Sequence, residues 1–303
     1  MVRVDPHYSS DAEVILFEGD CRDLLKEIPN ESVQLIVTSP PYNVGKPYER
    51  KIALDDYLSQ QEEIIAECVK TLSPTGSICW EVGNYVEKNR IYPLDILLYP
   101  IFNKLGLKMR NRVVWHFEHG LHCSRRLSGR HETIMWFTKN DDYVFNLDPI
   151  RVPQKYPQKK HFKGPNKGKY SSNPLGKNPG DVWVIPNVKH NHVEKTIHPC
   201  QFPVELVERL ILSLTNENDL VLDPFMGVGT TAVAAILHKR RAAGAEIVSD
   251  YFRIARERIN KASKGKLKYR KMNTPVYTPN GENQKKGVPE DSLKKVKTLT
   301  KYE

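Results

Sequence analysis

The chain has 303 residues, of which 39% are hydrophobic, so it can bury one large core together with a smaller lobe. It contains no apolar run long enough to cross a bilayer, and residues 1–10 lack the basic start and apolar centre of a signal peptide. The five cysteines are scattered and include no Cys-x-x-Cys pair, which argues against a zinc site and a disulfide framework. We therefore expect a globular, cytoplasmic protein with no membrane partner.

The net charge of +10 is concentrated in two segments. Residues 151–195 contain ten Lys or Arg against two Asp or Glu, and residues 261–303 contain twelve against four. In the first segment the lysines alternate with aromatic residues. This pattern predicts a polyanionic partner that is bound through salt-dependent phosphate contacts.

Apolar runs and helical spacing predict strands that alternate with helices along most of the chain. Strands are expected at 14–17, 33–38, 77–80, 111–117, 133–138, 219–223 and 242–247. Helices are expected at 21–27, 56–72, 91–105, 203–214, 230–238 and 250–262. This alternation is typical of an α/β fold with a parallel, doubly wound sheet.

Two long stretches lack this periodicity. Residues 139–195 are rich in Lys, Asn, Pro and Gly, and their scattered aromatic residues favour an ordered but irregular lobe. Beyond Ala262 the chain is rich in lysine, and we expect a tail that is flexible or loosely docked. A shorter stretch, Ser73-Pro74-Thr75-Gly76, predicts a turn after the helix at 56–72.

Two motifs each follow an expected strand: Ser39-Pro40-Pro41-Tyr42, and the segment from Asp223 to Thr231. In the second, Gly227 and Gly229 allow a tight turn and close approach to a ligand, and the next helix begins with free N–H groups. Its Gly-x-Gly-Thr-Thr pattern differs from the Gly-x-Gly-x-x-Gly of dinucleotide folds. A ligand without phosphate is therefore favoured over a nicotinamide cofactor.

Together these motifs resemble those of DNA methyltransferases that methylate an exocyclic amino group, the cytosine-N4/adenine-N6 family. The first motif precedes the second by about 185 residues, an order that resembles the β class of restriction-modification systems. The resemblance covers most of residues 13–260. It implies a Rossmann-like S-adenosylmethionine-dependent methyltransferase fold. It also implies a mostly parallel seven-stranded sheet with one antiparallel strand, and a small irregular DNA-recognition lobe.

The resemblance further implies that the chain binds S-adenosyl-L-methionine, releases S-adenosyl-L-homocysteine and uses no metal. The cofactor-binding residues it implies are Asp20, Thr38, His198, Pro199, Phe202, Asp223, Pro224, Phe225, Gly227, Gly229, Thr230, Thr231 and Glu246. Asp223 would lie near the amino-acid part of the cofactor. Glu246 would follow the next strand and hold the ribose hydroxyls; the alternative is a surface residue after an edge strand.

The catalytic residues implied by the resemblance are Ser39, Pro40, Pro41 and Tyr42. The amino nitrogen of a base is a poor nucleophile because its lone pair is delocalised into the ring. The Ser39 hydroxyl and the Pro40 carbonyl could accept its hydrogens, while the two prolines stiffen the loop. Tyr42 could stack on a flipped-out base. Methyl transfer is then expected as a single in-line displacement without a covalent enzyme intermediate.

Several alternatives follow from the same motifs. Carbon-5 cytosine methylation requires a cysteine nucleophile, and position 39 is serine. Serine in this position resembles cytosine-N4 enzymes, so we favour cytosine N4 and keep adenine N6 as the alternative. A non-catalytic DNA-binding protein on a methyltransferase scaffold, or methylation of RNA or a small molecule, would fit less well with intact motifs beside a basic lobe.

The resemblance divides the chain into four segments: a catalytic half at 1–118, a target-recognition lobe at 119–195, a cofactor-binding half at 196–262 and a basic tail at 263–303. Double-stranded DNA is the implied partner. Phosphate contacts are expected from Arg125, Arg126, Arg130, Lys159, Lys160, Lys163, Lys167 and Lys169. The histidines fit no standard metal site. A cognate restriction endonuclease and a second copy of the chain, in a homodimer, are further partners to consider.

Overall fold

The computed structural model describes residues 2–120 and 122–276, so the part of the basic tail at 277–303 lies outside the described residues. The strands are β1 (Val4–Asp5), β2 (Val14–Glu18), β3 (Val33–Thr38), β4 (Leu72–Val82), β5 (Asn84–Glu87), β6 (Arg90–Pro93), β7 (Lys108–His116), β8 (His131–Thr138), β9 (Val182–Val184), β10 (Leu220–Asp223) and β11 (Arg241–Glu246). The helices are α1 (Cys21–Glu27), α2 (Leu54–Thr71), α3 (Leu94–Lys104), the 3₁₀ turn η1 (Asp148–Ile150), α4 (Val204–Leu214), α5 (Thr230–Leu237) and α6 (Ser249–Ser263).

The main sheet has nine strands in the order β1-β2-β11-β10-β3-β4-β8-β7-β9. Within the described residues all neighbouring pairs are parallel except the two that β8 forms with β4 and β7. The predicted mostly parallel sheet with one antiparallel strand is therefore confirmed. Its predicted size of seven strands is two too few, because β1 and β9 add a short strand to each edge.

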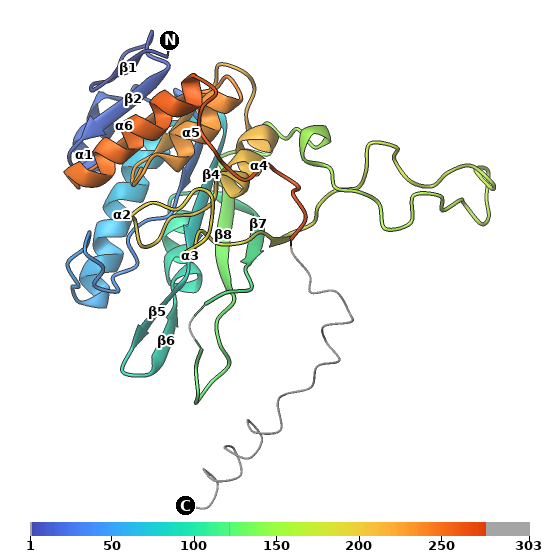
Figure 1. The fold of residues 1–303 in the computed structure, drawn as a ribbon, viewed down its shortest axis with the longest axis horizontal. Coiled ribbons are helices and arrows are strands. Elements are labelled where there is room, and N and C mark those ends of the chain that lie inside the picture. The colour runs from blue at the N-terminus through green and yellow to red at the C-terminus, as the bar shows by residue number, and fades with distance from the viewer. Residues whose placement is uncertain (1, 121, 277–303) are drawn as a thin grey trace, which may run out of the picture.

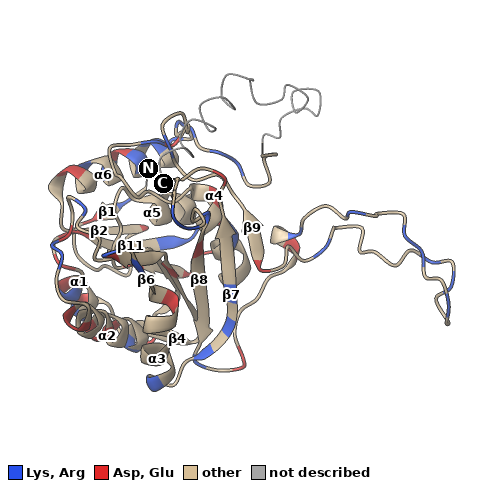
Figure 2. Cartoon of the chain, turned by 90° about the horizontal axis from the view of Figure 1, so that it is seen from below, with Lys and Arg blue, Asp and Glu red and all other residues tan. Residues whose placement is uncertain are grey.

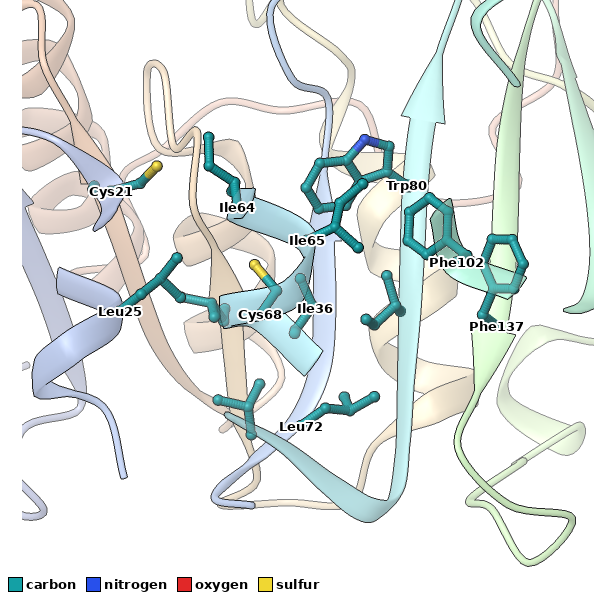
Figure 3. Packing of buried hydrophobic residues seen from close by; sticks show 14 of the residues in the cluster. Cys21, Leu25, Ile36, Ile64, Ile65, Cys68, Leu72, Trp80, Phe102 and Phe137 are labelled. Atoms are coloured by element: carbon teal, nitrogen blue, oxygen red, sulfur yellow. The ribbon is translucent and has the colours of Figure 1, made fainter. Parts of the chain in front are cut away.

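Helices cover both faces of this sheet (Figure 1). Strand residues alternate between the faces, as buried strands of period two require. On β3, Ile36 packs in the core beneath α1, α2 and α3, whereas Leu35 and Val37 pack in the core beneath α4, α5 and α6. Figure 3 shows the first core, where Phe102 of α3 stacks on Phe137 of β8 at 4.4 Å between ring centroids.

Parallel pairing brings the carboxyl ends of the central strands to one edge of the sheet. Glu246 of β11 pairs with Glu18 of β2, and Thr38 of β3 pairs with Trp80 of β4. Asp223, the last residue of β10, lies between these strands. Because ligands bind at this edge in open α/β sheets, the functional site is expected there.

Three local predictions differ from the structure. The hairpin β5–β6 was not expected, and α3 begins at Leu94 after it rather than at residue 91. The hairpin forms because Tyr85 is buried and packs on Tyr92. The stretch predicted as a turn at 73–76 instead belongs to β4, at a place where the register against β3 shifts.

Residues 119–195 contain regular and irregular parts. Trp183 of the unpredicted strand β9 is buried, and its indole lies 5.0 Å from the guanidinium of Arg209. Residues 151–178, here called the arm, extend away from the body (Figures 1 and 2). Two antiparallel bridges hold the arm as a narrow loop, Val152 with Lys177 and Lys160 with Tyr170. The arm carries its lysines into solvent along both of its limbs (Figure 2).

The first part of the tail is docked, contrary to the expectation of a loose segment. Arg270 forms an ion pair with the buried carboxylate of Glu205 on α4. The backbone N–H of Arg270 also donates to Glu194, at 3.1 Å. Leu267 and Tyr269 pack against the same side of the core as α4. Among the described residues, no helix combines the length and the apolar character that a membrane span requires.

Candidate active site

A cavity of about 240 Å³ lies at the carboxyl edge of the sheet. The predicted residues that line it are Asp20, Ser39, Pro40, Pro41, Tyr42, His198, Phe202, Pro224, Phe225, Gly227, Thr230 and Glu246. The two motifs, far apart in the sequence, thus meet on one cavity. Thr38, Asp223, Gly229 and Thr231 support its wall from behind, and Pro199 is not among the lining residues.

The motif after β3 is held by hydroxyl groups. Ser39 Oγ lies 3.0 Å from the hydroxyl of Tyr42, and that hydroxyl donates to Glu81 Oε2 at 2.7 Å. The hydroxyl of Tyr57, on α2, donates to the carbonyl of Pro41 at 2.9 Å. The loop is thus fixed from both sides, with the Ser39 hydroxyl on the cavity wall.

Asp223 is fully buried at the end of β10 and receives three hydrogen bonds. Its Oδ1 accepts from Thr38 Oγ1 at 2.6 Å and from the Phe225 N–H at 3.1 Å. Its Oδ2 accepts from Thr231 Oγ1 at 2.6 Å. Burial raises the pKa of Asp223 to about 6, although the three donors act in the opposite direction. The carboxylate therefore organises the loop from Pro224 to Thr231.

Glu246 ends β11 and borders the cavity. Its Oε1 accepts from the Val248 N–H at 2.7 Å, and its backbone carbonyl accepts from Gly19 at 3.0 Å. Burial raises the pKa of Glu246 to about 7. A carboxylate held in this way can accept hydrogen bonds from the hydroxyl groups of a bound ligand.

The glycines of the second motif serve two purposes. Gly227 has φ +55° beside the cavity, and Gly229 has φ +77° directly before α5. A Cβ on Gly229 would lie 2.9 Å from the Cβ of Ala255, so this glycine lets α5 approach α6 closely. Arg258 of α6 completes the corner by donating to the carbonyl of Val228 at 2.6 Å.

Three aromatic rings form another side of the cavity. His198 stacks on Tyr48 at 5.2 Å between centroids and meets the edge of Tyr251 at 4.6 Å. Burial lowers the pKa of His198 to about 4, so its ring is neutral at pH 7. Sequence reasoning missed both tyrosines. Tyr48 lies in a loop without periodicity, whereas Tyr251 follows Glu246 closely enough to have been a candidate.

The predicted DNA-contacting residues fall into two separate groups. Arg125, Arg126 and Arg130 lie in the loop between β7 and β8, at the edge of the sheet that carries the cavity (Figure 1). In this loop the side chain of Leu127 is 95% exposed. The lysines at 159, 160, 163, 167 and 169 are exposed on the arm, which projects elsewhere. In the described part of the chain, no three His, Cys, Asp or Glu side chains gather as metal ligands would.

The site therefore combines hydroxyl acceptors, a carboxylate at the end of the neighbouring strand and an adjoining aromatic and apolar wall. Comparison with known proteins identifies the class. The sequence profile of the N6/N4 DNA methylases matches residues 33–257, and the chain belongs to this family. It is an S-adenosyl-L-methionine-dependent enzyme that methylates an exocyclic amino group of a base in DNA.

Two relatives illustrate the range of the family. The chain is 54% identical to the type II methyltransferase M.BglII of Bacillus subtilis over 79% of this chain and 67% of that protein. It is 33% identical to the DNA adenine methyltransferase YhdJ of Escherichia coli over 84% of this chain and 85% of that protein. The family thus contains enzymes named for adenine, and membership alone leaves the base open.

Solved structures agree with the fold. The cytosine-N4-specific PvuII DNA methyltransferase superimposes with a TM-score of 0.65 over 84% of this chain and 92% of that one, at 20% identity. A DNA modification methylase of Thermus thermophilus, TTHA0409, complexed with S-adenosyl-L-methionine, superimposes with a TM-score of 0.58 over 82% and 94%, at 27% identity. The cavity fits this cofactor, because it offers the Glu246 carboxylate for hydroxyl groups beside the apolar surfaces of Phe225 and Ile247.

Proposed function

We propose that the chain methylates the N4 amino group of cytosine at a specific site in double-stranded DNA, as the modification enzyme of a restriction-modification system. The observation that carries this proposal is the position of Ser39, whose hydroxyl lies on the cavity wall beside the predicted cofactor residues. Adenine N6 is the second candidate, and the 33% identity to the adenine methyltransferase YhdJ favours it.

In this proposal the two ends of the cavity have different roles. S-adenosyl-L-methionine supplies the methyl group from its sulfonium. Glu246 accepts hydrogen bonds from the ribose hydroxyls, and Asp223 shapes the loop at the amino-acid end through Thr38 and Thr231. His198, Tyr48 and Tyr251 exclude water from the same end by their packing.

At the other end the target base enters beside Ser39-Pro40-Pro41-Tyr42. The amino hydrogens are accepted by Ser39 Oγ and by the carbonyl of Pro40. These acceptors favour the pyramidal nitrogen, whose lone pair points away from them and towards the methyl group. Both lie on a loop that its hydrogen bonds hold fixed, so most of the rate acceleration comes from positioning.

DNA is held by the two basic groups in different ways. The β7–β8 loop lies at the cavity edge, so Arg125, Arg126 and Arg130 contact the DNA near the target base, and Leu127 is placed to enter the space that the base leaves. The arm reaches further along the duplex and contributes phosphate contacts. Residues 119–195 act together as the target-recognition region, inserted between the two halves of the methyltransferase domain.

The test is mass spectrometry of nucleosides from plasmid DNA incubated with the protein and S-adenosyl-L-methionine. N4-methylcytosine supports the proposal. N6-methyladenine leaves the site and its chemistry in place but overturns the assignment of the base. A Ser39→Ala variant should lose at least about tenfold in kcat while retaining cofactor affinity, because one hydrogen-bonded acceptor is removed. Full activity of this variant would overturn the catalytic assignment of Ser39.

A further inference from the structure

Behind the cavity, a row of hydrogen-bonding groups leads from Ser39 into the core. Ser39 Oγ contacts the Tyr42 hydroxyl, and Tyr42 donates to Glu81 Oε2. Ser39 and Tyr42 line the cavity, but Glu81 does not. Glu81 is 3% exposed, so it can influence a bound base only through Tyr42.

The other oxygen of Glu81 has a second acid as its neighbour. Among the described residues, Glu81 Oε1 is buried and accepts no hydrogen bond from an N–H or hydroxyl donor. Glu81 pairs with Ile134 across β4 and β8, so Glu132 is its diagonal neighbour on the same face of the sheet. The two carboxyl groups hydrogen-bond to each other. Two carboxyl groups can do so only when one of them carries a proton.

The surroundings decide which acid holds this proton. Burial and the negative charge of Glu81 raise the pKa of Glu132 well above its usual value. Burial also raises the pKa of Glu81, but hydrogen bonds with Glu132, Ser39 and Tyr42 oppose this effect. Lys189 and Cys200 are the further groups that act on Glu132, and Lys189 only weakly favours its charge. A neutral Glu132 beside an ionised Glu81 therefore fits the contacts best.

The space around the pair is closed. A Cβ on Gly83 would lie 3.2 Å from the Tyr42 ring and 3.3 Å from the Glu132 side chain. The glycine between β4 and β5 thus allows both side chains to pack against the backbone. The packing holds Tyr42 and Glu132 in place around Glu81, which fixes the geometry of the row.

We propose that Glu132 is a positioning residue that donates its proton to Glu81 and thereby sets the direction of every hydrogen bond from Glu81 to Ser39. The ionised Glu81 accepts from Tyr42, so the Tyr42 oxygen accepts from Ser39. The Ser39 hydrogen is then turned into the wall, and its lone pairs face the cavity. This is the orientation needed to accept a hydrogen from the target amino group, and the inference rests on the proposed catalytic role of Ser39.

The experiment compares Glu132→Gln with Glu132→Leu in the full chain, with kcat, KM for DNA and cofactor affinity measured for each. Glutamine keeps an N–H donor towards Glu81, so kcat should stay within about threefold of wild type. Leucine removes the donor, and kcat should fall by about tenfold or more, the loss expected for one buried hydrogen bond. Both KM for DNA and cofactor affinity should change little. Equal kcat in the two variants would overturn the proposal.

A double-mutant cycle protects this test against a variant that folds poorly. Tyr42→Phe interrupts the row between Ser39 and Glu81. In this background the change from Glu132→Gln to Glu132→Leu should leave kcat unaltered, because no direction remains to be set. A full and multiplicative loss in the double variant would show that Glu132 acts through packing alone, which contradicts the proposal. Exchange of the exposed Glu118 for glutamine controls for the loss of charge on this face.

The outcome of the Ser39→Ala variant separates the two proposals. If Ser39→Ala is inactive and the Glu132 variants behave like wild type, only the positioning role of Glu132 fails. If Ser39→Ala remains active, the catalytic assignment of Ser39 fails, and the role of Glu132 fails with it.

Discussion

Thr38 and Asp223 are 185 residues apart in the chain, yet Thr38 Oγ1 donates a hydrogen bond of 2.6 Å to Asp223 Oδ1. Both side chains are fully buried. The bond joins the end of β3, which leads into Ser39, to the end of β10, which leads into the cofactor loop. The two halves of the site are thus connected by one contact in the core.

Replacing Thr38 by valine should test this connection, because valine has nearly the same shape but no hydroxyl. Asp223 would keep two of its three donors, and we expect the free energy of unfolding to fall by about 2 kcal/mol. Urea denaturation measures this loss. Thr38→Ser retains the hydroxyl and should stay within about 1 kcal/mol of wild type. A valine variant as stable as the serine variant would show that the bond contributes nothing.

The raised pKa of Glu246 predicts how stability depends on pH. In the folded protein this pKa is about 7, above the usual 4.5, so the folded state holds the proton more tightly than the unfolded chain does. Ionisation of Glu246 therefore costs stability progressively as the pH rises from about 4.5 to about 7, and the cost remains above pH 7. In the cofactor-free protein, Glu246→Gln should gain stability relative to wild type over this range. Thermal unfolding at pH 5 and pH 8 measures the difference.

The same variant should bind the cofactor less well. An ionised Glu246 is the better acceptor for ribose hydroxyls, so wild-type affinity for S-adenosyl-L-methionine should rise between pH 6 and pH 8, whereas the affinity of Glu246→Gln should rise less. Titration calorimetry at several pH values measures both. A glutamine variant with wild-type affinity at pH 8 would contradict the assignment of Glu246 to the cofactor.

The arm predicts a salt-dependent contribution to DNA binding. Changing its five lysines at 159, 160, 163, 167 and 169 to alanine should weaken binding to all sequences alike. It should also flatten the plot of log K against log salt concentration by about 0.9 for each lost phosphate contact. Fluorescence anisotropy with duplexes that contain or lack the site measures both effects. Alanine at the exposed Lys26 and Lys104, on α1 and α3, provides the control.

Two glycines with the same backbone conformation should respond differently to alanine. Gly229 and Gly265 have φ of +77° and +65°. Alanine at Gly265 meets open space and should cost about 1 kcal/mol of stability, the cost of the left-handed conformation alone. Alanine at Gly229 also meets Ala255 at 2.9 Å, so its cost should exceed that of the Gly265 variant by about 1–3 kcal/mol. Equal losses would show that α6 moves away freely.

Long periodic elements were predictable from the sequence because their cores repeat every two or 3.6 residues, as β3, β10 and α4 do. Two elements were missed because nonlocal contacts form them. The three-residue strand β9 exists because it pairs with β7, and the β5–β6 hairpin exists because Tyr85 packs in the core. No local pattern encodes either contact.

The site was predictable to a similar degree. Residues of the two motifs could be found because their spacing is specific. Glu81 gave a signal that was overlooked, since it follows an expected strand at 77–80 much as Glu246 follows another. Glu132 gave none, because its position beside Glu81 depends on the register between β4 and β8. Its role becomes visible only when the two antiparallel strands are aligned.

The short strands at the margins of the sheet affect how the protein behaves in concentrated solution. An open sheet exposes unpaired backbone groups on its outer strands, and a second chain can pair with them. Here the outermost strands are β1 and β9, of two and three residues. A strand that short offers few hydrogen bonds to an incoming chain. The described sheet is thereby protected against edge-to-edge aggregation, although its nine strands form no closed barrel.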